Sequence, residues 1–218
     1  MQQVTQMTQL TQNNSAGFSA SQAIAPARPW QLPARGLAVF HGAGDTARLS
    51  HYFLPRLIAQ GKRVLILDGA NSADPRLIAR FARERNIAFE EFSRRIQIAR
   101  AFTCFQLTEL IRRVPQFLRN FPAEVLIATA LPDLYFDEDV RDWDARVAFE
   151  QALAGLRHCA HSLIVAVFSS TPSFAPSPAR RRFFERTCAA AAEVWKFDLN
   201  EDFRSTLSLE ASRARQLL

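Results

Sequence analysis

The chain has 218 residues, of which 48% are hydrophobic and 22% are charged, so its composition is that of a globular protein and excludes a fibrous or wholly disordered one. The formal net charge is +6, and almost all of the positive charge comes from arginine, because the lysines are Lys62 and Lys196. This balance favours an anionic partner such as nucleic acid or a phosphate. A charge of this size is modest, however, and solubility alone would also account for it.

The cysteines Cys104, Cys159 and Cys188 are odd in number and far apart. Their spacing fits neither a disulfide framework nor a zinc site, which favours a reducing compartment. No apolar run approaches the roughly 18 residues of a membrane span. The N-terminus also lacks the basic and then apolar pattern of a secretory signal. From these features we expect a soluble cytoplasmic protein with no membrane partner.

Residues 1–33 differ in composition from the rest of the chain. They carry no charge before Arg28 and are rich in Gln, Thr, Ser and Asn. Such a segment buries too little apolar surface to order itself, and its prolines mark a junction. We therefore expect a flexible tail over residues 1–33 and one folded domain over residues 34–212.

Apolar strands alternate with amphipathic helices from residue 35 onward. Strands are predicted at 37–41, 64–67, 96–99, 124–130 and 163–168, and helices at 46–60, 75–86, 105–117, 142–159 and 178–191. This alternation predicts an α/β fold with a mostly parallel sheet and helices on both faces. Two last strands, at 193–198 and 204–209, flank Asn200-Glu-Asp, which is typical of a hairpin turn.

A glycine-bearing turn follows the first strand, in the run LAVFHGAGDTARLS. A strand, a glycine turn and a helix in this order are the layout of a phosphate-binding P-loop. Aligned from Gly42 on the Walker A pattern G-x-x-x-x-G-K-[ST], the second Gly, the Lys and the Ser/Thr are replaced by Ala47, Arg48 and Leu49. The degenerate Walker A motif predicts nucleotide-binding residues Gly42, Ala43, Gly44, Asp45, Thr46, Ala47 and Arg48.

The next part of the chain resembles the RecA/RadA recombinase core. The resemblance rests on a strand that ends in Asp68, a helix from Pro75, the run Ala99-Arg100-Ala101-Phe102 and Gln106 in the following helix. The strand VLIATA, the long helix after it, the strand LIVAVFSS and the closing hairpin continue the family's order over roughly residues 35–210. The resemblance implies a RecA-like three-layer fold, an ATP site and a role in DNA recombination or repair.

The residues that would hydrolyse ATP are largely changed. Phosphoryl transfer needs a lysine on the phosphates, a hydroxyl on Mg²⁺, an acidic residue and a group that positions water. In the places of the Mg²⁺ hydroxyl, the family's catalytic Glu, the Walker B Asp and the sensor Gln, the chain has Leu49, Ala70, Ala128 or Thr129, and Ser169-Ser170. Together these losses argue against efficient ATP hydrolysis. We therefore assign no catalytic residue and expect no firmly held Mg²⁺.

Three interpretations of the loop stay open. It is a tight strand–helix turn without a ligand, or it binds ATP without efficient hydrolysis through the helix N-terminus and Arg48. In the third, the protein is an atypical ATPase that acts as an oligomer and borrows catalytic groups from a neighbour.

The segment after the strand LIVAVFSS is a second candidate site, because the matching recombinase loop lines the DNA path. Arg180, Arg181, Arg182 and Arg186 are predicted to contact phosphates, and Phe183 or Phe184 to stack on bases. The alternative is a solvated helix face with both phenylalanines in the core. The family's other DNA-facing loop falls at residues 135–144, which are strongly acidic here and leave room for a protein partner.

Other chemistry receives little support from the sequence. His158 and His161 are interpreted as helix-end or packing residues, because no further metal ligands cluster with them. No Ser/His/Asp or Cys/His arrangement is recognisable for nucleophilic catalysis. Recombinases polymerise through a Phe-x-x-Ala tether, which Gly17-Phe18-Ser-Ala-Ser21 matches only in part.

The sequence thus favours a RecA-like accessory protein of DNA recombination or repair with a decayed nucleotide site. The candidate partners are DNA, a protein of the repair machinery and a second copy of the chain. The alternatives are an ATP-binding, DNA-dependent ATPase that acts as an oligomer, and a protein-interaction module without nucleic acid.

Overall fold

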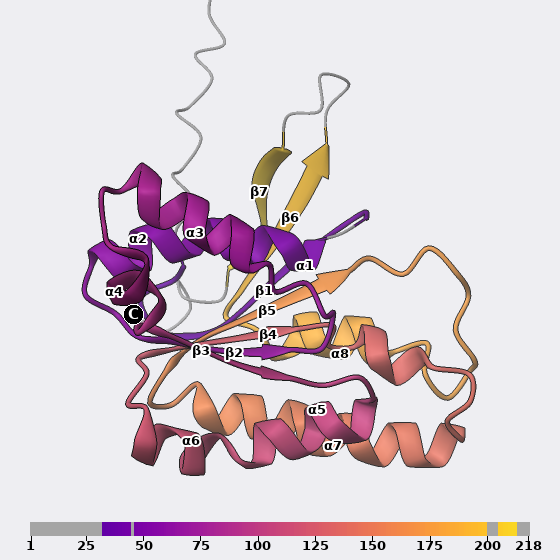
Figure 1. Cartoon of the computed structure of the whole chain (residues 1–218). Helices are drawn as coiled ribbons and strands as arrows, with labels where there is room; N and C mark the ends of the chain where they lie inside the picture. Colours follow the sequence, from indigo (N-terminus) through magenta and orange to yellow (C-terminus); the bar gives the residue numbers. More distant parts are fainter. Residues whose placement is uncertain (1–31, 45, 200–204, 213–218) are drawn as a thin grey trace, which may run out of the picture.

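The computed structural model describes residues 32–44, 46–199 and 205–212. Its strands form one seven-stranded sheet, comprising β1 (Gly36–Gly42), β2 (Val64–Asp68), β3 (Ile96–Arg100), β4 (Val125–Thr129), β5 (Ile164–Ser170), β6 (Glu193–Leu199) and β7 (Ser205–Ser212) (Figure 1). The order across the sheet is β3-β2-β4-β5-β1-β6-β7. All neighbouring pairs are parallel except β6 and β7, which are antiparallel. The prediction of an α/β fold with a mostly parallel sheet and a closing antiparallel pair is confirmed.

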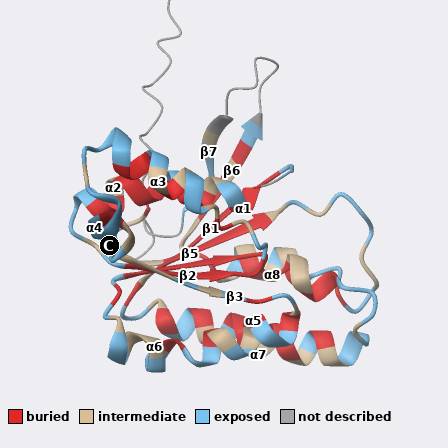
Figure 2. Ribbon diagram, viewed as in Figure 1, coloured by how far each residue is buried: buried red, intermediate tan, exposed pale blue. Residues whose placement is uncertain are grey.

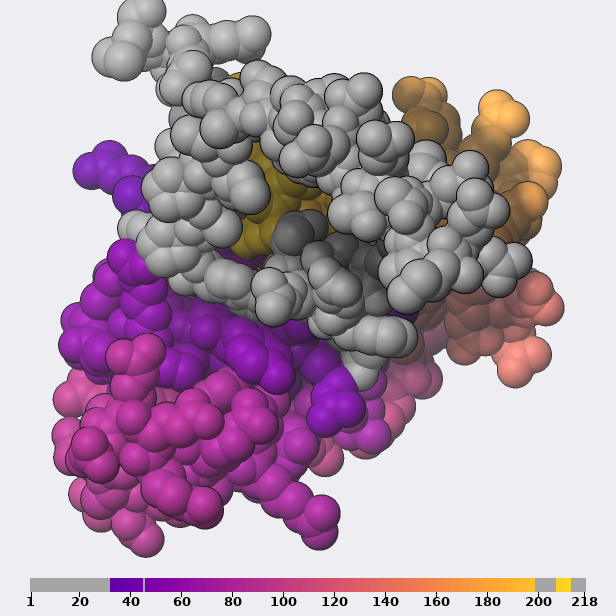
Figure 3. Space-filling model, turned by 90° about the horizontal axis from the view of Figure 1, so that it is seen from above, coloured from indigo at the N-terminus to yellow at the C-terminus, as the bar shows by residue number. Residues whose placement is uncertain are grey.

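Helices cover both faces of the sheet (Figure 1). One face carries α1 (Thr46–Leu49), the 3-10 helix η1 (Ser50–Phe53), α2 (Leu54–Ala59), α3 (Pro75–Glu84) and α4 (Phe89–Ser93). The other carries α5 (Cys104–Arg112), α6 (Val114–Asn120), α7 (Asp142–Cys159) and α8 (Phe183–Ala190). Figure 3 views the molecule from the side of α1–α3, and its indigo-to-magenta surface belongs to the N-terminal half of the described chain. The chain therefore fills one face before β3 and the other face after it.

The sheet divides the core into two apolar clusters, because alternate side chains of a strand point to opposite faces. In β1, Ala38 and Phe40 join the cluster under α2 and α3, whereas Leu37 and Val39 join the cluster under α5, α7 and α8. The rings of Phe40 and Phe168 stack with centroids 4.8 Å apart. The central strands β1, β2, β4 and β5 are buried along almost their whole length (Figure 2), as parallel strands covered on both faces should be.

Proline and capping residues set several helix boundaries. Asp74 accepts hydrogen bonds from the backbone N–H groups of Arg76 and Leu77, and Pro75 occupies the first turn of α3. The predicted helix 46–60 is divided into α1, η1 and α2, with Pro55 in the first turn of α2. The predicted helix 105–117 is wrong as a single helix, because Pro115 lies in the first turn of α6 and α5 has already ended at Arg112.

A few other boundaries differ from expectation. Residues 178–182 form turns rather than helix, and α8 begins at Phe183. The sequence pattern missed α4 and the 3-10 helix η2 (Asp133–Phe136), both of which are too short for a helical period. The predicted tail 1–33 falls almost entirely outside the described residues, as does the predicted turn at 200–202. Among the helices that the structure describes, none has the length and apolarity needed to cross a membrane.

Candidate functional site

The carboxyl ends of four parallel strands meet at one edge of the sheet. The strand register places Gly42 opposite Ser170, and it places Thr129 beside both Asp68 and Phe168. The predicted loop and the places of the family's catalytic residues therefore do come together. Ligands of open α/β sheets bind outside this edge, so it is the first candidate site.

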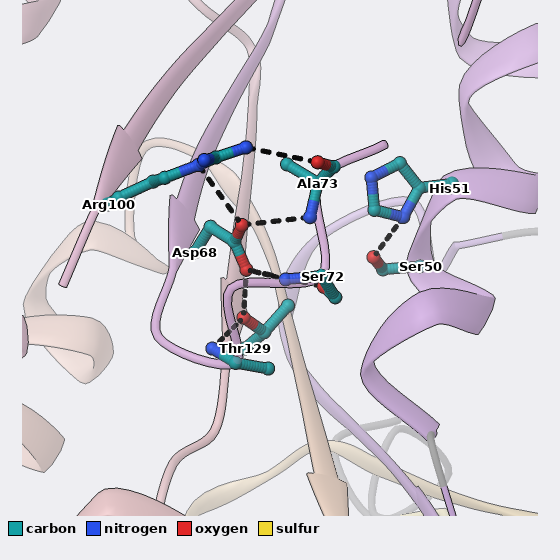
Figure 4. Close-up of polar contacts among 8 residues, drawn as sticks. Ser50, His51, Asp68, Ser72, Ala73, Arg100 and Thr129 are labelled. Carbon is teal, nitrogen blue, oxygen red and sulfur yellow. Dashed lines mark hydrogen bonds and ion pairs between the residues drawn. The ribbon is translucent and has the colours of Figure 1, made fainter. Parts of the chain in front are cut away.

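Asp68 is the centre of a buried polar network at this edge (Figure 4). Its side chain is fully buried, and its Oδ1 accepts hydrogen bonds from the backbone N–H of Ser72 at 3.0 Å and from the Thr129 hydroxyl at 3.1 Å. The hydroxyl of Ser72 also donates to Oδ1, at 3.2 Å. The other oxygen, Oδ2, accepts from the backbone N–H of Ala73 at 2.9 Å. A buried carboxylate is tolerated only when such donors replace its hydration.

Arg100 and Thr129 close the network from the neighbouring strands. The Nε of Arg100 lies 3.8 Å from Asp68 Oδ2, and its Nη2 donates to the carbonyl of Ala73 at 3.0 Å. Thr129, in the predicted Walker B place, also accepts a hydrogen bond from the N–H of Ala70 at 3.1 Å. The acid and hydroxyl at this edge are thus used to hold the 69–73 loop between β2, β3 and β4.

The loop after β1 is held by the segment that follows β5. The Gly42 carbonyl accepts from the N–H of Thr171 at 2.8 Å, and the Gly44 carbonyl accepts from the Ser170 hydroxyl at 3.1 Å. A side chain at Gly42 would lie 2.5 Å from the Phe197 carbonyl, and Gly44 has φ +73°, so both positions require glycine. Asp45, predicted as part of the nucleotide site and as a helix cap, lies outside the described residues.

The residues after the loop are positioned unlike those of a phosphate cradle. Thr46 and Ala47 are buried, whereas Arg48 is more than half exposed and lies 3.6 Å from Asp74 at the start of α3. The Thr46 Oγ1 is buried and has no hydrogen-bond partner among the described residues. Ala43 and Gly44 are exposed at the turn itself. The predicted nucleotide-binding residues that the structure describes therefore lie next to one another. Arg48, at the lysine position of the Walker A pattern, lies near the acidic Asp74.

His51 is a buried histidine beside the Asp68 network. Its Nδ1 lies 3.3 Å from the Ser50 hydroxyl, and in Figure 4 the opposite edge of the ring faces the Ser72–Ala73 segment. Its Nε2 is buried without a hydrogen-bond partner within the described ranges. Burial lowers the pKa of His51, so the ring is neutral at neutral pH. No sequence motif singles out His51.

Asp133 is a second acid that sequence reasoning missed. It begins η2 directly after β4, and its carboxylate accepts from the backbone N–H of Ser170 at 3.2 Å and from the Ser169 hydroxyl at 3.5 Å. Burial outweighs these hydrogen bonds and raises the pKa of Asp133 to about 6. The acid thus holds the end of β5, where the family's sensor Gln is expected. The signal that the sequence offers for Asp133 is its place shortly after a buried strand.

The four predicted DNA-binding arginines have different environments. Arg180 is 5% exposed. Its guanidinium lies 2.7 Å from Asp142 and donates to the carbonyls of Tyr135, Asp137 and Val140. Arg186 forms a two-pronged ion pair with Glu150. Both side chains bind the protein itself, which does not fit the predicted role as phosphate contacts.

Arg181 and Arg182 are exposed, and Arg182 lies 3.7 Å from Glu185. They are the two predicted arginines that face solvent. The prediction that Phe183 or Phe184 stacks on bases is left with Phe184, because the ring of Phe183 is buried against Phe149 with centroids 4.3 Å apart. An aromatic ring that is available lies earlier in the same loop, where Phe174 is 55% exposed.

The histidines and other potential metal ligands form no recognisable centre. The rings of His158 and His161 lie 6.3 Å apart at the end of α7. Within the residues that the structure describes, no group of three or more His, Cys, Asp or Glu side chains could hold a metal ion.

No protein-family model matches the chain, and a search of curated proteins finds no match. The resemblance to the RecA/RadA core therefore rests on the residues quoted above, and it enters the functional argument as a proposal.

The raised pKa of Asp133 predicts a specific pH dependence of stability. Because the folded state holds this proton up to about pH 6 and the unfolded state loses it near pH 4, the folded state binds more protons between these values. The wild-type free energy of unfolding therefore falls by roughly 2–3 kcal/mol relative to Asp133→Asn as the pH rises from 4 to 7.

Urea denaturation of both proteins at several pH values measures this difference. Asp139→Asn, which changes an exposed acid in the next loop, is the control and should follow the wild type. Parallel stability curves for the wild type and Asp133→Asn would show that the Asp133 carboxyl is not penalised by burial.

Proposed function

We propose that this chain is a RecA-like accessory protein of DNA recombination or repair whose nucleotide site does not hydrolyse ATP efficiently. The observation that carries the proposal is the Asp68 network. At the edge where the resemblance puts the ATP site, the carboxylate of Asp68 and the hydroxyl of Thr129 are bonded to each other and to the 69–73 loop. These two groups therefore hold the loop in place rather than bind Mg²⁺ or position water.

The arrangement of elements supports the RecA-like part of the proposal. The glycine turn after β1, the acidic end of β2 and the Ala-Arg-Ala-Phe run that begins in the last two residues of β3 follow each other as the resemblance requires. The strands that should carry the Walker B and sensor residues, β4 and β5, are neighbours between β2 and β1. The end of β5 lies beside the glycine turn, and the end of β4 lies beside that of β5 at the same edge.

The residues at the loop fit an anion better than they fit Mg²⁺–ATP. A Cβ placed on Gly44 would meet nothing within 4 Å, so the turn is open on that side, and the Thr46 hydroxyl is a buried donor without a partner among the described residues. The open side of the turn and Arg48 would hold the phosphates of ATP, whereas the Thr46 hydroxyl is buried. Leu49 offers no hydroxyl to Mg²⁺, and the protein as proposed binds nucleotide weakly and without help from the metal.

The first prediction from this proposal concerns ATP. Because the metal ligands are missing, a fluorescent ATP analogue should bind no more tightly with Mg²⁺ than without it, and phosphate release should equal the buffer blank with or without DNA. If nucleotide binds, Arg48→Ala should weaken it, whereas Arg56→Ala, on the adjoining α2, should not.

Two outcomes would change the proposal. Turnover that depends on Mg²⁺ and is lost in Arg48→Ala would overturn it in favour of the atypical ATPase. The absence of binding at millimolar nucleotide would leave the accessory role but remove the nucleotide from it.

The second prediction concerns DNA. Arg181 and Arg182 are exposed, and Phe174 supplies an exposed ring in the same loop. Changing both arginines to alanine should weaken binding of single-stranded DNA and reduce the slope of log K against log salt by about 1.4, because each lost phosphate contact contributes about 0.7.

Fluorescence anisotropy over a range of salt concentrations measures this slope. Arg112→Ala with Arg113→Ala, an exposed pair at the end of α5, is the matched control and should change it little. Wild-type protein that shows no salt-dependent binding would argue against direct contact with DNA.

A protein-interaction module is the second candidate function, and exposed aromatic side chains favour it. Trp143 and Phe102 are each 64% exposed, and Phe105 is about half exposed. Phe105 and Trp143 line the same groove of about 230 Å³ between α5 and α7. Exposed aromatic clusters are typical of protein–protein contacts. This function requires no nucleic acid, so the DNA titration separates the two candidates.

A further inference from the structure

The structure brings together a hydroxyl, a histidine and a carboxylate that are far apart in the sequence. The Nδ1 of His41 lies 3.0 Å from the hydroxyl of Thr171, and its Nε2 lies 2.8 Å from the carboxylate of Glu210. Thr171 lies 130 positions after His41 along the chain, and Glu210 lies 169 positions after it. The sequence therefore shows no motif for this arrangement.

Each of the three side chains is positioned by the sheet. His41 lies in β1 on the face covered by α8, and the ring of Phe184 packs edge-on against it at 5.1 Å. Thr171 follows β5 directly, and its backbone N–H is bound to the carbonyl of Gly42. Gly42 also belongs to the nucleotide segment proposed above, so the cluster adjoins that segment.

A β-bulge directs Glu210 toward His41. In the pairing of β6 with β7, Val194 lies opposite Ala211 and Trp195 lies opposite Leu209, so Glu210 is the extra residue between them. Bulges of this kind redirect a side chain and occur frequently beside active sites. The neighbouring cation Lys196, which lies next to His41 in the strand register, is paired with Asp198 at 2.9 Å. The hydrogen bond of the Glu210 carboxylate goes to His41.

The hydrogen bonds determine which nitrogen acts as a base. A carboxylate can only accept, so the Nε2 of His41 must carry the hydrogen that it donates to Glu210. In the neutral ring the Nδ1 then has a free lone pair, and the Thr171 hydroxyl must be the donor in the remaining contact. This is the relation of nucleophile, base and orienting acid that activates a hydroxyl for attack.

Solvent access differs between His41 and Thr171 in the way that a nucleophilic site needs. His41 is 5% exposed and is held by partners on both nitrogens, whereas Thr171 is exposed at the start of the loop after β5. A reagent can therefore reach the hydroxyl without entering the core. The base stays in a fixed orientation behind it.

From this geometry we propose that Thr171, His41 and Glu210 form a nucleophilic site that takes an acyl group from a compact activated ester or thioester onto Thr171. Thr171 is the nucleophile and His41 the general base. Glu210 is a positioning residue that fixes the tautomer of His41. The proposal is independent of ATP and DNA binding.

p-Nitrophenyl acetate is a compact activated ester of this kind. The Thr171 hydroxyl gives its proton to the Nδ1 of His41 while its oxygen forms a bond to the acetyl carbon. The bond from that carbon to the phenolic oxygen breaks, and p-nitrophenolate leaves with the electron pair. The imidazolium is held by Glu210 until its proton passes to solvent. No oxidant, reductant or metal is required.

Incubation of the full-length protein with p-nitrophenyl acetate, followed by peptide mass spectrometry, tests the proposal. We expect acetyl to accumulate on Thr171 faster than on the exposed Ser173 two residues away. Thr171→Val should abolish this product, and Thr171→Ser should retain it. Glu210→Gln should slow it by about 10²-fold, the lower range for a positioned general base, with an unchanged melting temperature.

The opposite outcomes would overturn the proposal. If Thr171 is acetylated no faster than Ser173, or equally fast in the wild type and Glu210→Gln, the three residues only fasten the hairpin to the sheet. If the three residues only hold the hairpin to the sheet, Glu210→Gln should have a lower melting temperature, and the peptide map should show no preference for Thr171 over Ser173. The two roles are therefore distinguishable even if one variant is destabilised.

Discussion

The carboxyl edge of the parallel strands depends on the hydrogen bonds of the buried Asp68 carboxylate. Removing a charge from water is costly, and the cost is offset here by donors from three parts of the chain. The backbone of the 69–73 loop contributes Ser72 and Ala73, and β4 contributes Thr129. Arg100 joins from β3. One side chain at the end of β2 thus orders the two adjacent strands and the connection to α3.

The backbone near Asp68 is adapted to this network. A side chain at Gly69 would lie 2.7 Å from the carbonyl of Thr129, so only glycine lets the loop turn so closely over β4. The same edge of a P-loop enzyme keeps its acids free for Mg²⁺ and water. Here Asp68 and Thr129 bond to each other and to the loop instead. Asp133 likewise holds the end of β5 by accepting a hydrogen bond from Ser170. The loop after β1 therefore belongs to an edge whose acids are bonded internally, while its own turn at Ala43 and Gly44 is exposed.

The sequence predicted the parts of the structure that follow from local periodicity. The fully apolar run at residues 64–67 is typical of a buried parallel strand, and the helix at Asp142–Cys159 agrees with its prediction at both ends. Because parallel strands end at one edge, the meeting of Gly42, Asp68 and Thr129 was also predictable.

The sequence could not predict contacts that depend on tertiary placement. Arg180 looked like one of four equivalent cations, yet its backbone position directs it into the carbonyls of the 135–140 segment. The contact of His41 with Glu210 depends on a bulge in β7, which alternation of apolar residues does not reveal. Pro115 indicates the break before α6, but the apolar residues keep a helical period on both sides of it, so the sequence predicted one continuous helix.

A double-mutant cycle between Asp68 and Thr129 tests most directly whether this edge is closed by internal bonds. The free energies of unfolding in urea of the wild type, Asp68→Ala, Thr129→Val and the double variant give the coupling between the two side chains. A closed edge predicts a coupling of about 1 kcal/mol or more, because the Thr129 hydroxyl donates directly to the buried carboxylate. Effects that add within about 0.3 kcal/mol would contradict this account, because Asp68 would then be free to serve a ligand.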